Sequence, residues 1–298
     1  PSGIRKFCDP LLTTEEVISL GVGEPDFETP WNVAEAGIYA IEQGHTSYTS
    51  NKGLLPLRQA VARDLANRYG ISYAPEEEIG ITSGVSEAVD IAIRALVDPG
   101  DEVLVAEPSY VSYSPCVTLA GGRPVPVSCR EEDEFTLTPE ALMEKVTGKS
   151  RALVMNFPNN PTGGVMGVEA IDAIADVILD HDLLVISDEV YSELTYEGTH
   201  AAVASHPELR ERTVTMNGFS KAYAMTGWRI GYLCAPKPLC ELALKIHQYV
   251  MLCAPIMGQM AAIEALRNGE EGKNAMVREY RHRRNIFVEG LNRIGLPC

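Results

Sequence analysis

The chain has 298 residues, of which 45% are hydrophobic and 22% are charged, and its formal net charge is -16. The length allows a large core, and the negative charge argues against nucleic acid or an anionic membrane as a partner. No apolar run approaches a membrane span, and the seven cysteines include no Cys-x2-Cys pair, which favours reduced thiols in a cytoplasmic protein and disfavours a metal site.

Hydrophobic periodicity predicts helices and strands that alternate along the chain. Helices are expected over 30–43 and 54–69, and a strand then turns into a helix near residue 82. The later strands are expected at 102–106, 151–156, 183–187, 213–217 and 229–234, with a helix over 168–180. Beyond Lys237 the pattern is helical, and the arginines of 276–291 are expected on a solvated helix face. The alternation predicts an α/β fold with a mainly parallel, doubly wound sheet covered on both faces.

The first strand-to-helix junction is a candidate anion site. It reads Ile81-Thr82-Ser83-Gly84-Val85-Ser86, so a strand passes through glycine into a helix. Backbone amides at a helix start attract phosphate, which makes Ser83, Gly84 and Val85 candidate ligands. Any β-to-α turn can contain Ser-Gly, so the motif needs support from others.

A rigid turn follows the strand at 151–156. Its sequence is Phe157-Pro158-Asn159-Asn160-Pro161-Thr162-Gly163, in which two prolines and a glycine restrict the backbone. This turn can present the side-chain amide of Asn160 to a ligand oxygen.

The next buried strand ends in Asp188, and Tyr191 follows three residues later. Open α/β sheets bind ligands at the carboxyl ends of their strands, although an aspartate there can equally well cap the next helix. As a ligand group, Asp188 would keep a pyridine nitrogen protonated. Tyr191 would then hydrogen-bond a phenolic oxygen, and its alternative is an ordinary half-buried tyrosine.

The segment Ser220-Lys221-Ala222-Tyr223-Ala224-Met225-Thr226-Gly227-Trp228-Arg229 is the most informative stretch. A desolvated lysine can lose its proton and attack a carbonyl, and an arginine eight residues later is suited to a phosphate. In isolation the pair would be a surface lysine beside a structural arginine. Together with the other motifs, it points to pyridoxal 5'-phosphate (PLP) bound by Lys221.

In their order and spacing these motifs resemble class I aminotransferases of PLP fold type I, close to the aspartate aminotransferase-like enzymes of archaea and bacteria. The resemblance runs from about Gly3 to Cys298 and implies PLP as cofactor. It also implies an L-amino acid and a 2-oxo acid as substrates, ping-pong transamination, and a homodimer with shared active sites. The site residues it implies are Lys221 as Schiff-base lysine and proton shuttle; Asp188 at the pyridine nitrogen; Asn160 and Tyr191 at the phenolic oxygen; Arg229, Ser220, Ser83, Gly84 and Val85 at the phosphate; Tyr110 stacked on the ring; Tyr48 at the phosphate of the neighbouring subunit; and Gly23 with Asn160 near the substrate.

The resemblance also implies a domain division. Residues 1–29 would belong to the small domain and the edge of the active site, and 30–240 would form the large PLP-binding domain. Residues 241–298 would form the interdomain helix and the start of an α+β small domain that is incomplete here. Relatives continue into a segment with the arginine that binds the substrate α-carboxylate, so these 298 residues are expected to be a fragment.

Two positions depart from the family pattern. Many relatives carry a phosphate-binding serine three residues before the lysine, where this chain has Gly218. Some aspartate aminotransferases have a lysine for the distal carboxylate where this chain has Ser86, which leaves aspartate, alanine, aromatic or broad specificity open, with 2-oxoglutarate as the expected acceptor. Two alternatives to an aminotransferase remain at this point: a PLP-dependent carbon–sulfur β-lyase, and a non-catalytic aminotransferase-like regulatory domain.

Overall fold

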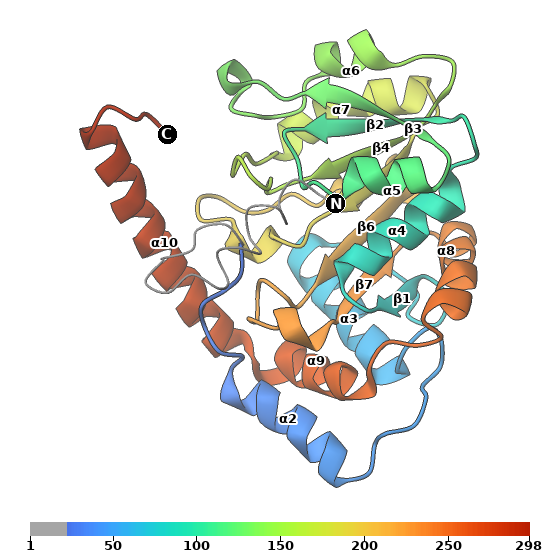
Figure 1. Ribbon diagram of the computed structural model, residues 1–298, viewed down its shortest axis with the longest axis vertical. Coiled ribbons are helices and arrows are strands. Elements are labelled where there is room, and N and C mark those ends of the chain that lie inside the picture. The colour runs from blue at the N-terminus through green and yellow to red at the C-terminus, as the bar shows by residue number, and fades with distance from the viewer. Residues whose placement is uncertain (1–22) are drawn as a thin grey trace.

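The computed structural model of the protein describes residues 23–298, and Figure 1 shows a central twisted sheet flanked by helices. The sheet has seven strands in the order β1-β7-β6-β5-β4-β2-β3. The strands are β1 (Ile79–Thr82), β2 (Glu102–Glu107), β3 (Arg123–Ser128), β4 (Ser150–Asn156), β5 (Leu184–Asp188), β6 (Thr213–Gly218) and β7 (Gly231–Cys234). Strand β7 pairs antiparallel with β1 and β6, and the other pairings are parallel. The expected α/β fold with a mainly parallel sheet is confirmed.

Helices cover both faces of the sheet, and a separate group lies at one end of it (Figure 1). The α-helices of the described residues are α2 (Trp31–Glu42), α3 (Leu55–Tyr69), α4 (Val85–Leu96), α5 (Tyr113–Leu119), α6 (Pro139–Lys145), α7 (Val168–Asp180), α8 (Lys237–Val250), α9 (Ile256–Asn268) and α10 (Glu270–Arg293). Helices α4, α5 and α8 contribute to one core, and α6 and α7 to the core on the opposite face. Helices α3 and α9 pack with β1 and β7 in a third core.

Strand β4 explains why both faces of the sheet must be covered. Ala152 and Val154 belong to the core beneath α4, whereas Leu153 and Met155 belong to the core beneath α7. Successive side chains of a strand point to opposite faces, so a continuous apolar run buries both. The same run therefore predicts a two-sided sheet directly from the sequence.

Several details of the fold differ from the expected elements, including the short helices α5 and α6, which were not predicted. Strand β3 was not predicted, because Pro124 and Pro126 disfavour a strand, and the structure accommodates them by placing β3 at the sheet edge. Strand β7 begins at Gly231 rather than Arg229, which has left-handed backbone dihedrals. In α10, Arg283 is not merely solvated, since its Nη1 donates to both carboxylate oxygens of Asp26 at 2.9 and 2.8 Å.

Within the described part of the chain, no helix combines the length and the apolar character needed to cross a membrane.

Candidate active site

The candidate residues gather where β4, β5 and β6 end. Asn156 and Asp188, the last residues of β4 and β5, are register partners, and Asp188 in turn pairs with Met216 of β6. Parallel strands bring their carboxyl ends to one edge, so the loops that follow them lie together. These loops carry Asn160, Tyr191 and Lys221.

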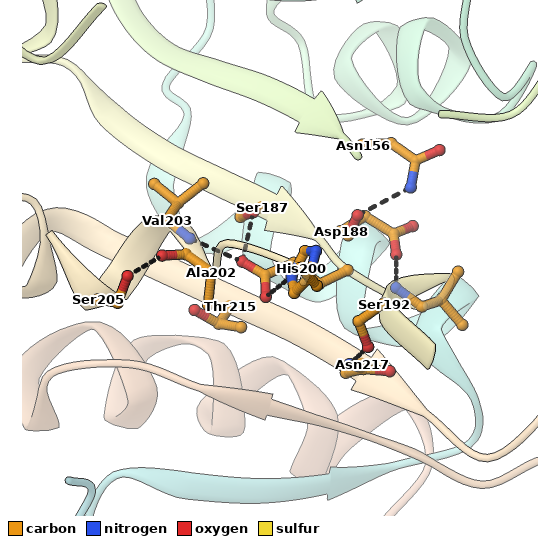
Figure 2. Close-up of polar contacts among 12 residues, drawn as sticks. Asn156, Ser187, Asp188, Ser192, His200, Ala202, Val203, Ser205, Thr215 and Asn217 are labelled. Carbon is orange, nitrogen blue, oxygen red and sulfur yellow. Dashed lines mark hydrogen bonds and ion pairs between the residues drawn. The ribbon is translucent and has the colours of Figure 1, made fainter. Parts of the chain in front are cut away.

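Asp188 is a buried carboxylate with neutral hydrogen-bond donors. Its Oδ2 accepts from Tyr113 Oη at 2.8 Å, and its Oδ1 accepts from the amide of Val190 at 3.1 Å. Asn156 Nδ2 donates to the Asp188 carbonyl at 2.8 Å, which fixes the backbone at the strand end (Figure 2). Burial raises the pKa of Asp188 to about 6, although the hydrogen bond from Tyr113 acts in the opposite direction. The site therefore holds an acid whose ionised form needs a cationic partner.

Tyr113 was missed in the sequence, although it contacts the central carboxylate. It begins α5 and is 1% exposed, and burial raises its pKa well above the usual value. Its ring lies edge-on to Tyr110, with centroids 5.7 Å apart. Tyr110 itself is 39% exposed, which leaves an aromatic face for a ligand. Tyr113 is separated from Asp188 by 75 residues, so no local pattern could have paired them.

Asn160 and Tyr191 meet as the sequence predicts. The side-chain Nδ2 of Asn160 lies 3.3 Å from Tyr191 Oη. The backbone amide of Asn160 donates to Asn156 Oδ1 at 3.1 Å. Asn156 thus braces both the Asn160 turn and the end of β5. Burial is the main cause of the raised pKa of Tyr191, so this phenol stays protonated and can donate a hydrogen bond to a ligand.

A buried polar cluster holds the chain after β5 in place (Figure 2). Glu189 Oε1 accepts from Ser187 Oγ at 2.9 Å and from the Val203 amide at 3.1 Å, and its Oε2 lies 2.9 Å from His200 Nε2. Glu189 is 1% exposed, so these partners satisfy a carboxylate that would otherwise be costly to bury. The cluster fixes the backbone on both sides of Asp188 and Tyr191.

Lys221 lies in the loop 219–230, which joins β6 to β7. Its Nζ donates to the Gly23 carbonyl at 2.6 Å and lies 5.9 Å from the ring centroid of Tyr191. Burial is the main cause of a lowered pKa for Lys221; Arg229 lowers it further, whereas Glu24 and Asp188 raise it. A lowered pKa increases the neutral fraction of the amine, which is the nucleophilic form.

Residues 82–85, here called the phosphate turn because they form the candidate phosphate site, lie against Arg229. Gly84 is the N-cap of α4, has a φ of 79° and leaves the helix without a side-chain cap. These backbone dihedrals, φ 79° and ψ 166°, strongly favour glycine, and a Cβ there would also displace Arg229 Nη2, which would lie 2.7 Å from it. Arg229 is exposed, and its Nη1 donates to the Thr226 carbonyl at 2.9 Å. An uncapped helix start beside a guanidinium is a suitable cradle for an anion.

Gly218, which replaces the serine of many relatives, sits at the base of this cradle. It pairs with Gly231 across β6 and β7, and a Cβ at Gly218 would lie 3.1 Å from the Gly231 Cα and 3.2 Å from Val85 Cγ2. Any side chain at this position would press on the phosphate turn. The departure from the family pattern thus has a steric basis in this chain.

Three other candidates contribute less to the assembled group. The Ser83 amide is already used, because it donates to Glu87 Oε2 at 2.5 Å. Ser220 is half-buried in the Lys221 loop, where its carbonyl accepts from Met225. Tyr48 is 83% exposed in the connection between α2 and α3.

A family model described as aminotransferase class I and II matches residues 15–298. The chain belongs to the class I and II aminotransferase family. This aminotransferase is 52% identical to the Bacillus subtilis protein YugH, over 100% of this chain and 77% of that protein. YugH is named as an aminotransferase, and its name specifies no substrate. It is 43% identical to aromatic-amino-acid aminotransferase 2 of Thermococcus litoralis, with the same coverages.

A solved relative confirms the fold of the aminotransferase. The structure of Thermus thermophilus aspartate aminotransferase with maleate aligns with a TM-score of 0.93 at 38% identity, over 99% of this chain and 78% of that one. The chain therefore has PLP fold type I and is a PLP-dependent transaminase.

The residues present fit this cofactor at each of its polar groups. The uncapped start of α4 with Arg229 suits the phosphate, and the buried acid Asp188 suits a basic ring nitrogen. Lys221, with its lowered pKa, suits the aldehyde.

Proposed function

We propose that the aminotransferase moves an amino group between an L-amino acid and a 2-oxo acid in two half-reactions, at the site centred on Lys221 and Asp188. The observation that carries the proposal is the placement of a half-buried amine with a lowered pKa and a buried carboxylate with a raised pKa at one sheet edge. Perturbed pKa values that bring an amine and a carboxylic acid closer to neutral pH are typical of acid–base sites.

The remaining candidates would hold the cofactor around these two groups. Asn160 and Tyr191 would donate hydrogen bonds to its phenolic oxygen, and Tyr110 would lie against its ring. Gly84, Val85 and Arg229 would bind its phosphate. When bound, the cofactor supplies an aldehyde that links to amines and a protonated ring that accepts electrons.

Lys221 would perform the proton transfers of each half-reaction. Its amine, once released, would take the proton from the substrate α-carbon and deliver it to the former aldehyde carbon of the cofactor, on the other side of the amino nitrogen. The lowered pKa favours this role because a base must be neutral at the operating pH. Gly23, whose carbonyl accepts from Lys221, would lie near the substrate carboxylate.

The substrate assignment stays broad. Relatives of similar identity are named for aromatic amino acids and for aspartate, at 43% in both cases. Ser86, in the first turn of α4, cannot form the ion pair that a lysine there would offer to a distal carboxylate. We therefore propose aspartate, alanine or an aromatic amino acid as donor and 2-oxoglutarate as acceptor.

Product analysis tests the proposed reaction. With PLP, one amino donor and 2-oxoglutarate, we expect glutamate and the matching 2-oxo acid in equal amounts. Double-reciprocal plots of rate against donor concentration, each at one fixed concentration of 2-oxoglutarate, should be parallel lines. Without 2-oxoglutarate, turnover should stop after one equivalent per site. Continued release of pyruvate and ammonia from a sulfur amino acid without any acceptor would instead identify a carbon–sulfur lyase.

We also propose that two copies form a dimer and that Tyr48 serves the partner's site. Large apolar side chains are exposed among the described residues: Trp31 of α2 is 70% exposed and Tyr249 of α8 is 87% exposed. The loop with Tyr48 is anchored to α9, since Gln259 Nε2 donates to Thr49 Oγ1 at 3.1 Å. Sedimentation equilibrium is expected to give twice the chain mass, and a monomer would contradict the shared site. We also propose the domain division expected from the sequence: residues 1–29 with the small domain, 30–240 as the large PLP-binding domain, and 241–298 as the interdomain helix and the start of the small domain.

A further inference from the structure

A contact between a carboxylate and a buried imidazole lies directly behind the phosphate turn. Glu87, in the first turn of α4, places its Oε1 2.6 Å from Nδ1 of His247 in α8. Its Oε2 accepts from the Ser83 amide at 2.5 Å. The side chain of His247 is 0% exposed and that of Glu87 is 10% exposed. One carboxylate therefore joins the turn to a helix 160 residues away in the chain.

Within the described residues, the imidazole of His247 makes no other hydrogen bond. An ionised carboxylate can only accept, so Nδ1 is the donor to Glu87. The second ring nitrogen, Nε2, is buried without a hydrogen-bond partner among the described residues. Burying a polar ring with one nitrogen unsatisfied is costly, and a leucine would fill similar space without that cost. The contact with Glu87 is thus the property that distinguishes histidine at this position.

The position of Glu87 in α4 determines which backbone amides its carboxylate can reach, and therefore what the contact with His247 controls. With Gly84 as N-cap, Glu87 is the third helical residue, and glutamate at that position commonly reaches back to the N-cap amide. Here the carboxylate binds the amide of Ser83 instead, one residue earlier. The amides of Gly84 and Val85 are the ones that a phosphate would need, and a carboxylate on them would both occupy and repel it.

We propose that His247 is a positioning residue for the cofactor phosphate: it holds the Glu87 carboxylate on the Ser83 amide and off the Gly84 and Val85 amides. The inference rests on the proposed placement of the phosphate at this turn. It makes Ser83 a fixed part of the turn rather than a phosphate ligand.

The proposed role of His247 is tested by comparing the affinity for PLP with the affinity for the same cofactor without its phosphate. Dissociation constants of the cofactor-free protein are measured for PLP and for pyridoxal, which lacks the phosphate. In His247→Leu, the released carboxylate competes with phosphate, so we expect Kd for PLP to rise about tenfold, while Kd for pyridoxal stays within about twofold. His247→Asn keeps a donor near the place of Nδ1 and should retain most of the wild-type affinity. His247→Gln, with the same amide one bond further out, should resemble His247→Leu.

The double variant His247→Leu/Glu87→Ala gives the sharpest result. Removal of the competing carboxylate should restore PLP affinity toward the wild-type value, although it removes a second native side chain. Equal weakening of PLP and pyridoxal, or a double variant no better than His247→Leu, would overturn the role. If His247→Leu does not fold, as judged by thermal melting, the contrast between Asn and Gln decides the same point.

The wild type separates this inference from the proposed function. Failure of the wild-type protein to bind PLP would remove the proposed site altogether. Tight binding of PLP by the wild type and by every His247 variant would remove only the role of His247.

Discussion

Lys221→Ala is expected to abolish transamination, with a loss in kcat of about 10⁴-fold or more, because it removes both the nucleophile for the aldehyde and the base for the α-proton. Lys221 is half-buried; its Nζ lies 5.9 Å from the ring centroid of Tyr191, and the charge of Asp188 acts on its pKa. The measurement is the steady-state rate of 2-oxo acid formation. It is combined with mass spectrometry after borohydride reduction, which should leave the cofactor mass on the Lys221 peptide of the wild type only.

A surface lysine supplies the matched control. Lys245 is exposed on α8, so Lys245→Ala should keep wild-type activity and the same labelled peptide. If Lys221→Ala retained turnover, or if the label appeared on another lysine, the assignment of Lys221 would fail.

Asp188→Asn is expected to lower kcat by about 10²- to 10³-fold while the cofactor stays bound. The variant keeps the shape of the side chain, but a neutral amide cannot hold a positive charge on the ring nitrogen, and electrostatic groups of this kind contribute on that scale. Steady-state kinetics at saturating PLP, with bound cofactor measured separately, distinguishes loss of rate from loss of cofactor. An undiminished rate would mean that another group protonates the ring.

Tyr113→Phe provides a graded comparison for the same carboxylate. It removes one hydrogen bond to a charged group and leaves the charge in place, so we expect a smaller loss of about 10- to 100-fold. Because that hydrogen bond lowers the pKa of Asp188, the variant should also move the acidic limb of the pH–rate profile to higher pH. A loss as large as that of Asp188→Asn would show that Tyr113 does more than donate to this carboxylate.

The stability of the cofactor-free protein gives Asp188→Asn a second readout. The pKa of Asp188 is raised by folding from 3.8 to about 6, so the folded protein binds more protons than the unfolded chain between these values. The wild type therefore loses stability as pH rises through this window, by about 3 kcal/mol. The variant lacks this loss, so its melting temperature relative to the wild type should rise from pH 4 to pH 7. Asp180→Asn, at an exposed helix end, should track the wild type, and parallel curves for Asp188→Asn would contradict the raised pKa.

The sequence predicts those parts of the fold that depend on neighbouring residues. The apolar run 183–187 and the carboxylate that follows it predict both β5 and the place of Asp188, since strand burial and strand end are local properties. The helix at 168–180 matches α7 because its apolar residues repeat at helical spacing. The turn with Asn160 was predicted from its prolines and glycine.

The parts that were missed depend on which elements become neighbours. Tyr113 reaches Asp188 only because the sheet order places β2, whose loop leads to α5, beside β4. His247 reaches Glu87 only because α8 packs on α4. Neither pairing has a signal in periodicity or composition. Strand β3 was missed for the opposite reason, because the local signal of its two prolines is overridden by its place at the edge.

The loop that carries Lys221 and Arg229 is a closed ring, with β6 and β7 paired at its base through Gly218 and Gly231. The reach of both side chains is thus set by how many residues the ring contains. A residue inserted between Lys221 and Arg229 would displace one of the two side chains, because the pairing of β6 with β7 fixes both ends of the loop. A library that randomises the length of this loop should therefore yield few active members, even when Lys221 and Arg229 are both kept.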